Sequence, residues 1–297
     1  MQDRIIMQDR ELQFSSPLVM AILNVTPDSF SDTEHLMDVN SITAAAARAL
    51  TQGADIIDIG GCSTRPSSGA VDETEEMRRV RLGVTAVRTA FPNAIISVDT
   101  FRSKVAEEAV NCGADIINDI SGGMLDPEMF TTVARLHTPY ILTHTRMQHF
   151  VPQEPFLDGQ VGMHAPFFEG NVMGEGPSTG DIIEDMLNFF RIRIEQLQQL
   201  SVTDIIIDPG YGFGKTLEQN YEILRRQAEL LALDMPILAG VSHKSMIYKP
   251  LNVAPYETQI GTAAINMMAL HNGAHILRVH EVKDAKQLIK LHALCQA

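Results

Sequence analysis

The chain of 297 residues contains few cysteines and no long apolar run. Its three cysteines, Cys62, Cys112 and Cys295, form no CxxC pair and no even framework, which is typical of a reduced, cytoplasmic protein. No window approaches the ~18 uncharged apolar residues of a membrane span, and the N-terminal MQDRIIMQDRELQF lacks the apolar segment of a signal peptide. We therefore expect neither a membrane segment nor a disulfide-rich fold.

Basic residues are also scarce: 23 Lys and Arg stand against 37 Asp and Glu, which gives a net charge of −14. A nucleic-acid partner usually requires a basic stripe, and the chain has no run of basic residues, so we expect no such partner. An anionic ligand would need the few cations to converge at one place.

What the chain does contain is a repeating unit. Short apolar, β-branched runs predict strands, and the longer amphipathic stretches between them predict helices. The runs are continuous rather than alternating, which indicates a parallel sheet with helices on its faces. The strands are expected at 18–23, 55–59, 94–98, 115–117, 140–143, 204–207, 236–239 and 275–279, and the helical stretches between and after them include 41–52, 73–90, 102–112, 182–200, 217–231, 258–272 and 282–295.

Eight strands, each followed by a helix, predict a single-domain α/β fold, a (β/α)8 TIM barrel spanning residues 1–297. An open doubly wound sheet is the alternative, but the first strand runs into NVTPDSF rather than into a glycine-rich turn. Residues 1–15 are expected to form a short N-terminal extension with a frayed end. Residues 146–180, after the fifth strand, form a loop long enough for a lid or a disordered insertion.

Nearly every predicted strand ends in a polar or charged side chain. In a barrel these ends converge on one mouth, so the pattern predicts a functional site. In chain order the residues are Asn24; Asp58 with Thr64, Arg65 and Pro66; Asp99; Asn118 and Asp119; His144; Asp208; His243, Lys244 and Ser245; Arg278 and His280.

The residues at the strand ends fall into two chemical groups. The acceptors Asp99, Asp208 and Asn118 suit a heterocycle that presents N–H donors. The second group suits a phosphate or diphosphate with Mg²⁺. It comprises the cations Arg65, Lys244 and Arg278 with His280, and Asn24 as an oxygen ligand. The pattern predicts one pole for a donor-rich ring and another for a dianionic leaving group.

Several segments resemble the signature segments of the dihydropteroate synthase family in order and spacing. They are LVMAILNVTPDSFSD, GADIIDIGGCSTRP, SVDT, IINDISGG, IIIDPGYGFGK, GVSHKS and ILRVHEV. The resemblance implies a transferase of folate biosynthesis that condenses 6-hydroxymethyl-7,8-dihydropterin diphosphate with p-aminobenzoate to give 7,8-dihydropteroate and pyrophosphate. It also implies a (β/α)8 barrel, Mg²⁺ as a cofactor and a homodimer.

Carried over by motif, the resemblance gives each site residue a role. It implies that the pterin is held by Asp99, Asn118, Asp208 and Lys244. It implies that the diphosphate is held by Asn24, Arg65, Arg278 and His280, with Asn24 also on Mg²⁺. The p-aminobenzoate pocket would be lined by Thr64, Pro66, Phe213 and Ser245. The residues expected to act in catalysis are Arg65, Asp99, Lys244, Arg278 and His280.

The chain departs from the family pattern at four places. Thr33 and Glu34 stand where a glycine pair is common, Cys62 where glutamate is common, and His243 where arginine is usual. The fourth departure follows the fifth strand, where THTRM replaces the common MHMxGTP, and it bears on how the pterin is covered.

Some of the residues also allow a structural interpretation. Asp58 could cap backbone N–H groups or contact a ligand, and Lys215 could be a solvated lysine or a contact to the diphosphate or the loop. We interpret His144 as a core histidine and Cys62 as a loop filler rather than a reactive thiol. The glycines at 210, 212 and 214 are expected to permit tight turns, because no P-loop spacing is present.

Three other functions are alternatives to the synthase. A pterin-binding methyltransferase domain would lack the cations of STRP and RVH, which are present here. An aldolase would form a Schiff base on Lys244, which borohydride would trap. A catalytically inactive, ligand-binding homologue is suggested only by the altered segment after the fifth strand.

Overall fold

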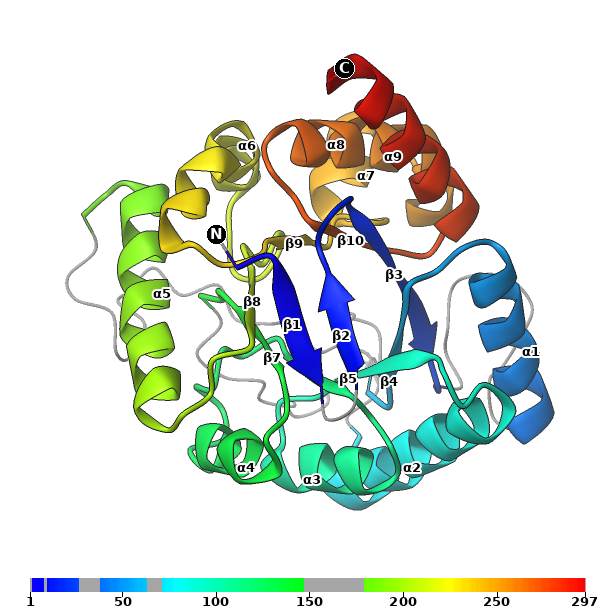
Figure 1. Cartoon of the computed structure of the whole chain (residues 1–297). Coiled ribbons are helices and arrows are strands. Elements are labelled where there is room, and N and C mark those ends of the chain that lie inside the picture. The colour runs from blue at the N-terminus through cyan, green and yellow to red at the C-terminus, as the bar shows by residue number, and fades with distance from the viewer. Residues whose placement is uncertain (1, 8–9, 27–37, 63–70, 147–178, 297) are drawn as a thin grey trace, which may run out of the picture.

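The computed structural model of the chain describes residues 2–7, 10–26, 38–62, 71–146 and 179–296. Within them, eight parallel strands form one sheet in the spatial order β8-β7-β6-β5-β4-β3-β10-β9. A parallel bridge between Ile207 and Ile237 joins the two outer strands, so the sheet curls into a barrel (Figure 1). The predicted (β/α)8 barrel is confirmed over the open sheet. The strands are β3 (Leu18–Asn24), β4 (Ile56–Gly60), β5 (Ile95–Asp99), β6 (Ile116–Asp119), β7 (Tyr140–Thr143), β8 (Ile205–Asp208), β9 (Leu238–Ala239) and β10 (Ile276–Val279).

Helices surround the barrel (Figure 1). Each of the seven expected helices is present, although the one at 217–231 ends early and continues as the 3₁₀ helix η1. Two short helices, α4 and α7, were not predicted. No helix among the described residues is long and apolar enough to cross a membrane. The helices are α1 (Val39–Thr51), α2 (Glu73–Ala90), α3 (Ser103–Asn111), α4 (Met129–Leu136), α5 (Ile182–Gln199), α6 (Leu217–Arg226), η1 (Gln227–Leu233), α7 (Ser245–Leu251), η2 (Pro255–Glu257), α8 (Gln259–His271) and α9 (Val282–Gln296).

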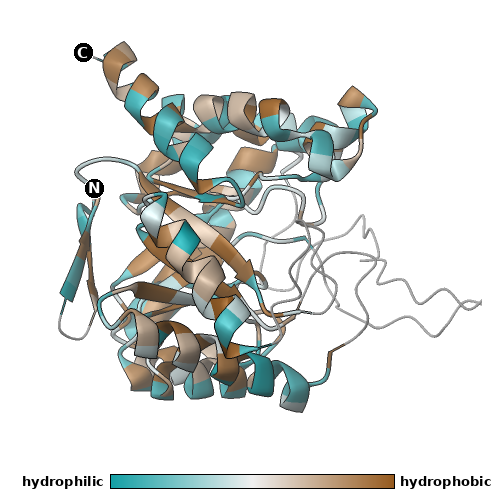
Figure 2. Ribbon diagram, turned by 90° about the vertical axis from the view of Figure 1, so that its right-hand side faces the viewer, coloured by the Kyte–Doolittle hydropathy of each residue, from teal (hydrophilic) through white to brown (hydrophobic). Residues whose placement is uncertain are grey.

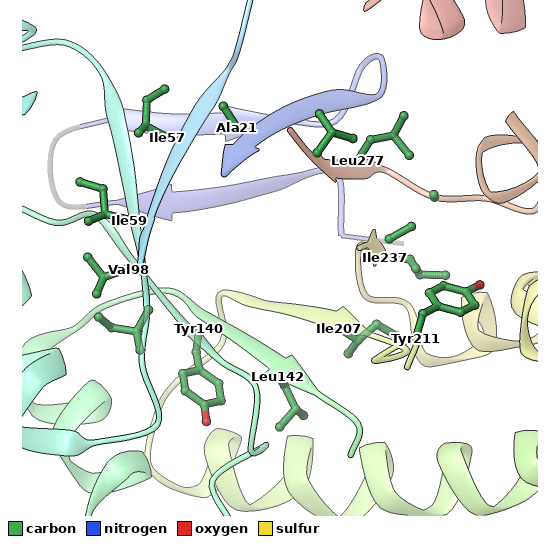
Figure 3. Packing of buried hydrophobic residues seen from close by; sticks show 14 of the residues in the cluster. Ala21, Ile57, Ile59, Val98, Tyr140, Leu142, Ile207, Tyr211, Ile237 and Leu277 are labelled. Atoms are coloured by element: carbon green, nitrogen blue, oxygen red, sulfur yellow. The ribbon is translucent and has the colours of Figure 1, made fainter. Parts of the chain in front are cut away.

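The outward-facing side chains of the strands form the larger hydrophobic core. Ile57, Val98 and Leu277 are fully buried in it, where the barrel packs against its helices (Figure 3). Tyr140 and Tyr211 belong to the same core and are also fully buried. Because the strands are covered on this face and filled on the other, their sequences are continuously apolar, as the sequence analysis required.

The inward-facing side chains divide the barrel interior into two layers. The apolar layer lies at the N-terminal ends of the strands and contains Leu18, Met20, Ile56, Ile116, Ile141, Ile206, Leu238 and Ile276. Side chains alternate along a strand, so the next inward residue lies two positions later. The inward residue after Ile206 is therefore Asp208, and the inward residue after Ile276 is Arg278. The inward positions at the C-terminal ends therefore form a polar layer above the apolar one.

The N-terminal extension is a β-hairpin, so the expectation of a frayed end is wrong. Strand β1 (Arg4–Met7) pairs antiparallel with β2 (Arg10–Gln13), and the hairpin stands at one end of the barrel (Figure 2). Ile5, Met7 and Leu12 pack into the apolar layer, and Ile6 N donates to Asp204 Oδ1 at 2.6 Å, just before β8. In strands of four residues, the alternation of exposed and buried residues is too short to be recognised in the sequence. The hairpin that these strands form nevertheless closes the N-terminal end of the barrel.

Ile5 and its neighbour Ile6 test this closure because they face opposite sides of β1. Ile5 is fully buried, whereas Ile6 is 56% exposed. We expect Ile5→Ala to lower the free energy of unfolding by about 2–4 kcal/mol, since it opens a cavity in the apolar layer. Ile6→Ala should change it by less than about 0.5 kcal/mol. Urea unfolding of both variants measures this, and equal effects would contradict the closure.

Candidate active site

The polar layer is assembled by strand register. Strand pairing places Asp58 beside Ser97 and Asp99 beside Asn118. Asp208 ends β8 and Arg278 lies on β10, both at inward positions. The structure therefore brings together Asp99, Asn118, Asp208 and Arg278, as the sequence predicted for residues at strand ends.

Arg278 is the central cation of this layer. Its Nε donates to Asp58 Oδ2 at 2.6 Å and its Nη2 donates to Asp99 Oδ2 at 2.7 Å. Asn118 Nδ2 donates to the same Asp58 oxygen at 3.1 Å. Burial disfavours the guanidinium, but the charges of Asp58 and Asp99 outweigh it and raise the pKa of Arg278 above its ordinary value. Asp58 thus holds Arg278 and Asn118, a role that neither of its two sequence interpretations anticipated.

The carboxyl groups of this layer carry shifted pKa values. Burial raises the pKa of Asp99 to about 7, although the charge of Arg278 opposes the shift. Burial also raises the pKa of Asp208, against the charge of Lys244 and a hydrogen bond from Gly210 N. Carboxyl groups whose pKa values are raised by burial at the ends of barrel strands are typical of functional sites.

Lys244 lies over the loop that follows β8. Its Nζ donates to Tyr211 O at 2.6 Å and lies 4.3 Å from the centroid of the Phe213 ring. Burial lowers the pKa of Lys244 to about 8, although the Asp208 carboxylate opposes this. The contact places Phe213 and Lys244 in one wall of the site.

The glycine-rich loop 210–214 is held by Lys215. The Lys215 side chain is buried, and its Nζ donates to His144 O at 2.9 Å, Gly210 O at 2.7 Å and Phe213 O at 3.3 Å. The interpretation of Lys215 as a solvated lysine is therefore wrong, and the loop contact is confirmed. Gly210 has φ +66°, and a Cβ there would lie 2.0 Å from His144 O, so the tight-turn interpretation also holds.

His144 and the ends of the segment after β7 are anchored to α5. The His144 ring is fully buried, packs edge-on against Phe189 at 5.1 Å and has a pKa lowered well below its ordinary value by burial, which confirms a core histidine. Arg146 Nη2 donates to Asp185 Oδ2 at 2.7 Å, and Thr179 N donates to Asp185 Oδ1 at 2.8 Å. The two described ends of the segment after β7 are thus both bound to the Asp185 carboxylate. Residues 147–178, most of the suggested lid, lie outside the described residues.

The segment after β4 carries the expected Thr64, Arg65 and Pro66, which lie outside the described residues. Its two ends are held by α2 and α3. Arg79 Nη1 donates to Gly61 O at 3.3 Å, and Arg102 Nη2 donates to Val71 O at 3.0 Å. Arg102 also pairs with the fully buried Glu76, which accepts from Thr100 Oγ1 at 2.7 Å. The sequence analysis missed Glu76, because one acid in the run ETEE carries no sign of being buried.

The remaining expected residues lie at the same end of the barrel. Asn24 ends β3, and its Oδ1 lies 2.9 Å from where a Cβ of Gly60 would be. Ser245 is the first residue of α7 rather than part of a loop. His280 follows β10, with Nδ1 at 2.9 Å from Ser242 Oγ. In the part of the chain that the structure describes, no three His, Cys, Asp or Glu side chains form a metal cluster.

Cys62 follows β4 closely, at the start of the segment that carries Thr64, Arg65 and Pro66, and is partly buried. Burial raises the pKa of its thiol, although the nearby Arg102 charge opposes the shift. A raised pKa disfavours the thiolate, so the interpretation as a loop filler is favoured over a reactive thiol.

The mouth contains buried polar atoms without a hydrogen-bond partner among the described residues. They are Thr26 Oγ1, Asp58 Oδ1, Ser97 Oγ, Asn118 Oδ1 and Thr143 Oγ1. Buried polar atoms are normally satisfied, and leaving one unpaired costs about 1–3 kcal/mol. Asp58 Oδ1 and Asn118 Oδ1 can only accept, so they suit a ligand that presents donors. Ser97 and Thr143 were missed, although their inward position follows from alternation with Asp99 and Ile141.

Comparison with known proteins agrees with this geometry. The family model for pterin binding enzymes matches residues 20–280. The dihydropteroate synthase of Escherichia coli K12 is 36% identical over 292 residues, which cover 97% of this chain and 95% of the relative. That of Synechocystis is 39% identical over 279 residues, with 92% and 88% covered.

Solved structures give the same result. The Yersinia pestis dihydropteroate synthase in a sulfonamide drug complex has a TM-score of 0.83 at 35% identity, covering 99% of this chain and 98% of its own. The Xanthomonas albilineans dihydropteroate synthase with 4-aminobenzoic acid has a TM-score of 0.83 at 32% identity, covering 100% and 99%. The chain therefore belongs to the pterin-binding enzyme family and, within it, to the dihydropteroate synthases, which are transferases of folate biosynthesis.

Proposed function

We propose a role for each residue of this mouth in the dihydropteroate synthase reaction, in which p-aminobenzoate displaces pyrophosphate from 6-hydroxymethyl-7,8-dihydropterin diphosphate. The observation that carries the proposal is the set of unpaired acceptor oxygens beside Arg278. Asp58 Oδ1 and Asn118 Oδ1 are buried and lack a donor, so a ring edge with several N–H groups would satisfy them.

The pterin end comprises Asp99, Asn118, Asp208 and Lys244. The carboxylates accept from the N–H groups of the ring, while Lys244 donates to a ring oxygen or nitrogen. As the C–O bond breaks, the dihydropterin ring shares the positive charge that develops on its exocyclic CH₂ group. Carboxylates held in a buried layer stabilise that charge electrostatically, which is commonly the largest catalytic contribution.

The diphosphate end comprises Arg278, His280, Arg65 and Asn24. A guanidinium has five N–H donors, and the bonds to Asp58 and Asp99 use two of those of Arg278, so it can hold the carboxylates and still donate to a leaving diphosphate. The aniline nitrogen of p-aminobenzoate is neutral near pH 7, so its attack requires no strong base.

Mg²⁺ is proposed as the cofactor, held by Asn24. The lack of a Cβ at Gly60 leaves room for Asn24 Oδ1, and an amide oxygen is a suitable ligand for this cation. Mg²⁺ typically takes one or two protein oxygens together with substrate phosphates and waters, so a site without an acidic cluster fits it. When bound, it would neutralise charge on the departing diphosphate.

The p-aminobenzoate pocket is proposed at Phe213 and Ser245 with Thr64 and Pro66. Phe213 lies beneath Lys244 of the pterin end, so the ring of an aromatic acid can pack against Phe213 beside the pterin. The bound 4-aminobenzoic acid in the Xanthomonas albilineans relative supports this class of substrate.

We further propose a homodimer in the cytoplasm. Leu251, Tyr256 and Ile260, from α7, η2 and α8, are exposed, with Ile260 at 86%, and such apolar side chains favour a protein partner. None of the three cysteines forms a disulfide, which suits a reducing compartment.

Asp99→Asn and Asp208→Asn should each weaken pterin binding. Each replaces an acceptor with an amide, whose NH₂ would face a ligand N–H, and an unpaired buried group costs about 1–3 kcal/mol, or roughly ten- to hundredfold in affinity. Calorimetry with 6-hydroxymethylpterin measures this. Asp204→Asn, at the opposite end of β8, is the control and should leave the affinity unchanged. Unchanged affinity in both test variants would remove these residues from the site.

The pterin affinity should also depend on pH through Asp99. Because the pKa of Asp99 is about 7, its carboxyl gains a proton as the pH falls through that value and loses an acceptor site. Affinity is therefore expected to be higher at about pH 8 than at about pH 6. Titrations of the wild type and Asp99→Asn compare the slopes. The same slope in the variant would show that another group is responsible.

Binding of p-aminobenzoate should be coupled to pyrophosphate. Arg65 stands beside Thr64 in the sequence, and a diphosphate with Mg²⁺ would give it an anionic partner next to a residue proposed for the p-aminobenzoate pocket. We expect p-aminobenzoate to bind about tenfold tighter with pyrophosphate and Mg²⁺ present, and Arg65→Ala to abolish the difference. Arg81→Ala, on the exposed face of α2, is the control. Equal affinity with and without pyrophosphate would mean that the pocket is preformed.

A further inference from the structure

Four side chains beside the mouth form a chain of hydrogen bonds. His243 Nε2 lies 2.7 Å from Glu281 Oε1, and Ser242 Oγ donates to Glu281 Oε2 at 3.5 Å. Ser242 Oγ also lies 2.9 Å from His280 Nδ1. The chain ends at a residue of the diphosphate end, whereas the proposed mechanism assigns nothing to His243 or Glu281.

The partners of His243 determine its protonation. Nδ1 lies 2.7 Å from Pro255 O, which can only accept, and Nε2 faces a carboxylate, which also accepts. The Thr258 hydroxyl, 2.7 Å from Nδ1, donates its own proton to the same Pro255 carbonyl at 2.6 Å. A neutral imidazole has one N–H and would leave one contact without a proton, so the geometry favours the doubly protonated ring.

The Ser242 hydroxyl links Glu281 to His280. Glu281 uses one oxygen for His243 and the other for the Ser242 hydroxyl, which has a single proton. With that proton on the Glu281 side, Ser242 Oγ accepts from His280 Nδ1, and it also accepts from His280 N at 3.4 Å. The orientation of the His280 ring therefore depends on where Glu281 holds Ser242.

The backbone of His243 has a conformation that is uncommon for a residue other than glycine. Its φ is +56°, in the left-handed region that non-glycine residues seldom adopt. Its turn is closed by Lys244 N, which donates to Val241 O at 3.2 Å, and His243 N donates to Thr262 Oγ1 at 3.4 Å. Strained conformations of this kind persist where surrounding contacts fix them, often at functional sites.

We propose that His243, as an imidazolium, is a positioning residue that holds Glu281 and, through Ser242, orients His280 for the diphosphate. The inference rests on the proposed role of His280. Because the imidazolium loses its proton as the pH rises, the orientation, and with it diphosphate binding, weakens in the same direction.

Other titratable groups lie near the ring and enter the design of the test. The His280 ring centroid lies 5.0 Å from that of His243, and Lys244 follows it in the chain. Glu257, on η2, directs its carboxylate to Ala254 N at 2.8 Å. Pyrophosphate itself also titrates, so absolute pH profiles mix several groups, and only a comparison of variants isolates His243.

Calorimetric binding of pyrophosphate with Mg²⁺, from about pH 6 to about pH 8.5, provides that comparison. His243→Arg keeps a permanent cation, and His243→Asn removes the charge while tolerating the left-handed backbone. We expect the affinity of wild type relative to His243→Arg to fall about fivefold across this range, and His243→Asn to be about fivefold weaker than wild type at the acidic end.

The matched control is His137→Asn. His137 is the C-cap of α4 and has φ +51°, so the substitution is the same in chemistry and backbone but lies away from the mouth. It should leave pyrophosphate affinity unchanged at every pH. A flat ratio of wild type to His243→Arg, or wild-type affinity in His243→Asn at the acidic end, would overturn the proposal.

A second measurement reads the charge directly and does not depend on the function. The ring ¹⁵N resonances of His243, assigned by their loss in His243→Asn, should show both nitrogens protonated near neutral pH, and a neutral ring there overturns the proposal. His280→Ala separates the two levels of inference. If it leaves pyrophosphate affinity unchanged, the diphosphate role of His280 is wrong, and the orienting role of His243 fails with it, whereas the resonances still decide the protonation.

Discussion

The ion pairs of Arg278 with Asp58 and Asp99 are the interaction on which the polar layer depends. Asp58 is fully buried, and Arg278 and Asp99 are largely buried. Removing one partner of a buried pair typically costs about 3–5 kcal/mol, because a charge remains without compensation. Around them, the described side chains of this layer include three carboxyl groups, Asp58, Asp99 and Asp208, but only two cations, Arg278 and Lys244. Among the described side chains, carboxyl groups therefore outnumber cations in this layer. This is in keeping with burial raising the pKa values of Asp99 and Asp208 against the opposing charges of Arg278 and Lys244.

The fold keeps the charged groups of the polar layer apart from the apolar packing that stabilises the barrel. Alternation along each strand places apolar side chains at one end of the interior and polar ones at the other, two residues apart. The outer face is apolar along the whole strand and packs against helices. The polar layer can therefore keep unpaired atoms without weakening the packing beneath it. Only the ends of the strands and the following turns carry the chemistry, as is general for this architecture.

The strands and the polar anchors were predictable because their signals are local. A continuously apolar run followed by Asp208 or Arg278 specifies both a buried strand and the residue at its end. The short elements were not predictable in this way: α4 spans 8 residues and α7 spans 7 with Pro250 inside it, too few for helical periodicity to be recognised. Nor could the sequence show which acid of ETEE is buried. Glu76 acquires its role from Arg102, 26 positions away, and such pairing exists only in three dimensions.

The closing of the barrel by the hairpin also has a consequence for synthesis on the ribosome. The hairpin is made well before the groups that receive it: Ile6 N is bonded to Asp204, 198 positions away, and Gln2 N donates to Asp234 O. Until β8 and the segment before β9 have emerged, Ile5, Met7 and Leu12 have no complete apolar layer to enter. The hairpin residues thus reach their final environment long after they are translated, and contacts of such high sequence separation slow folding.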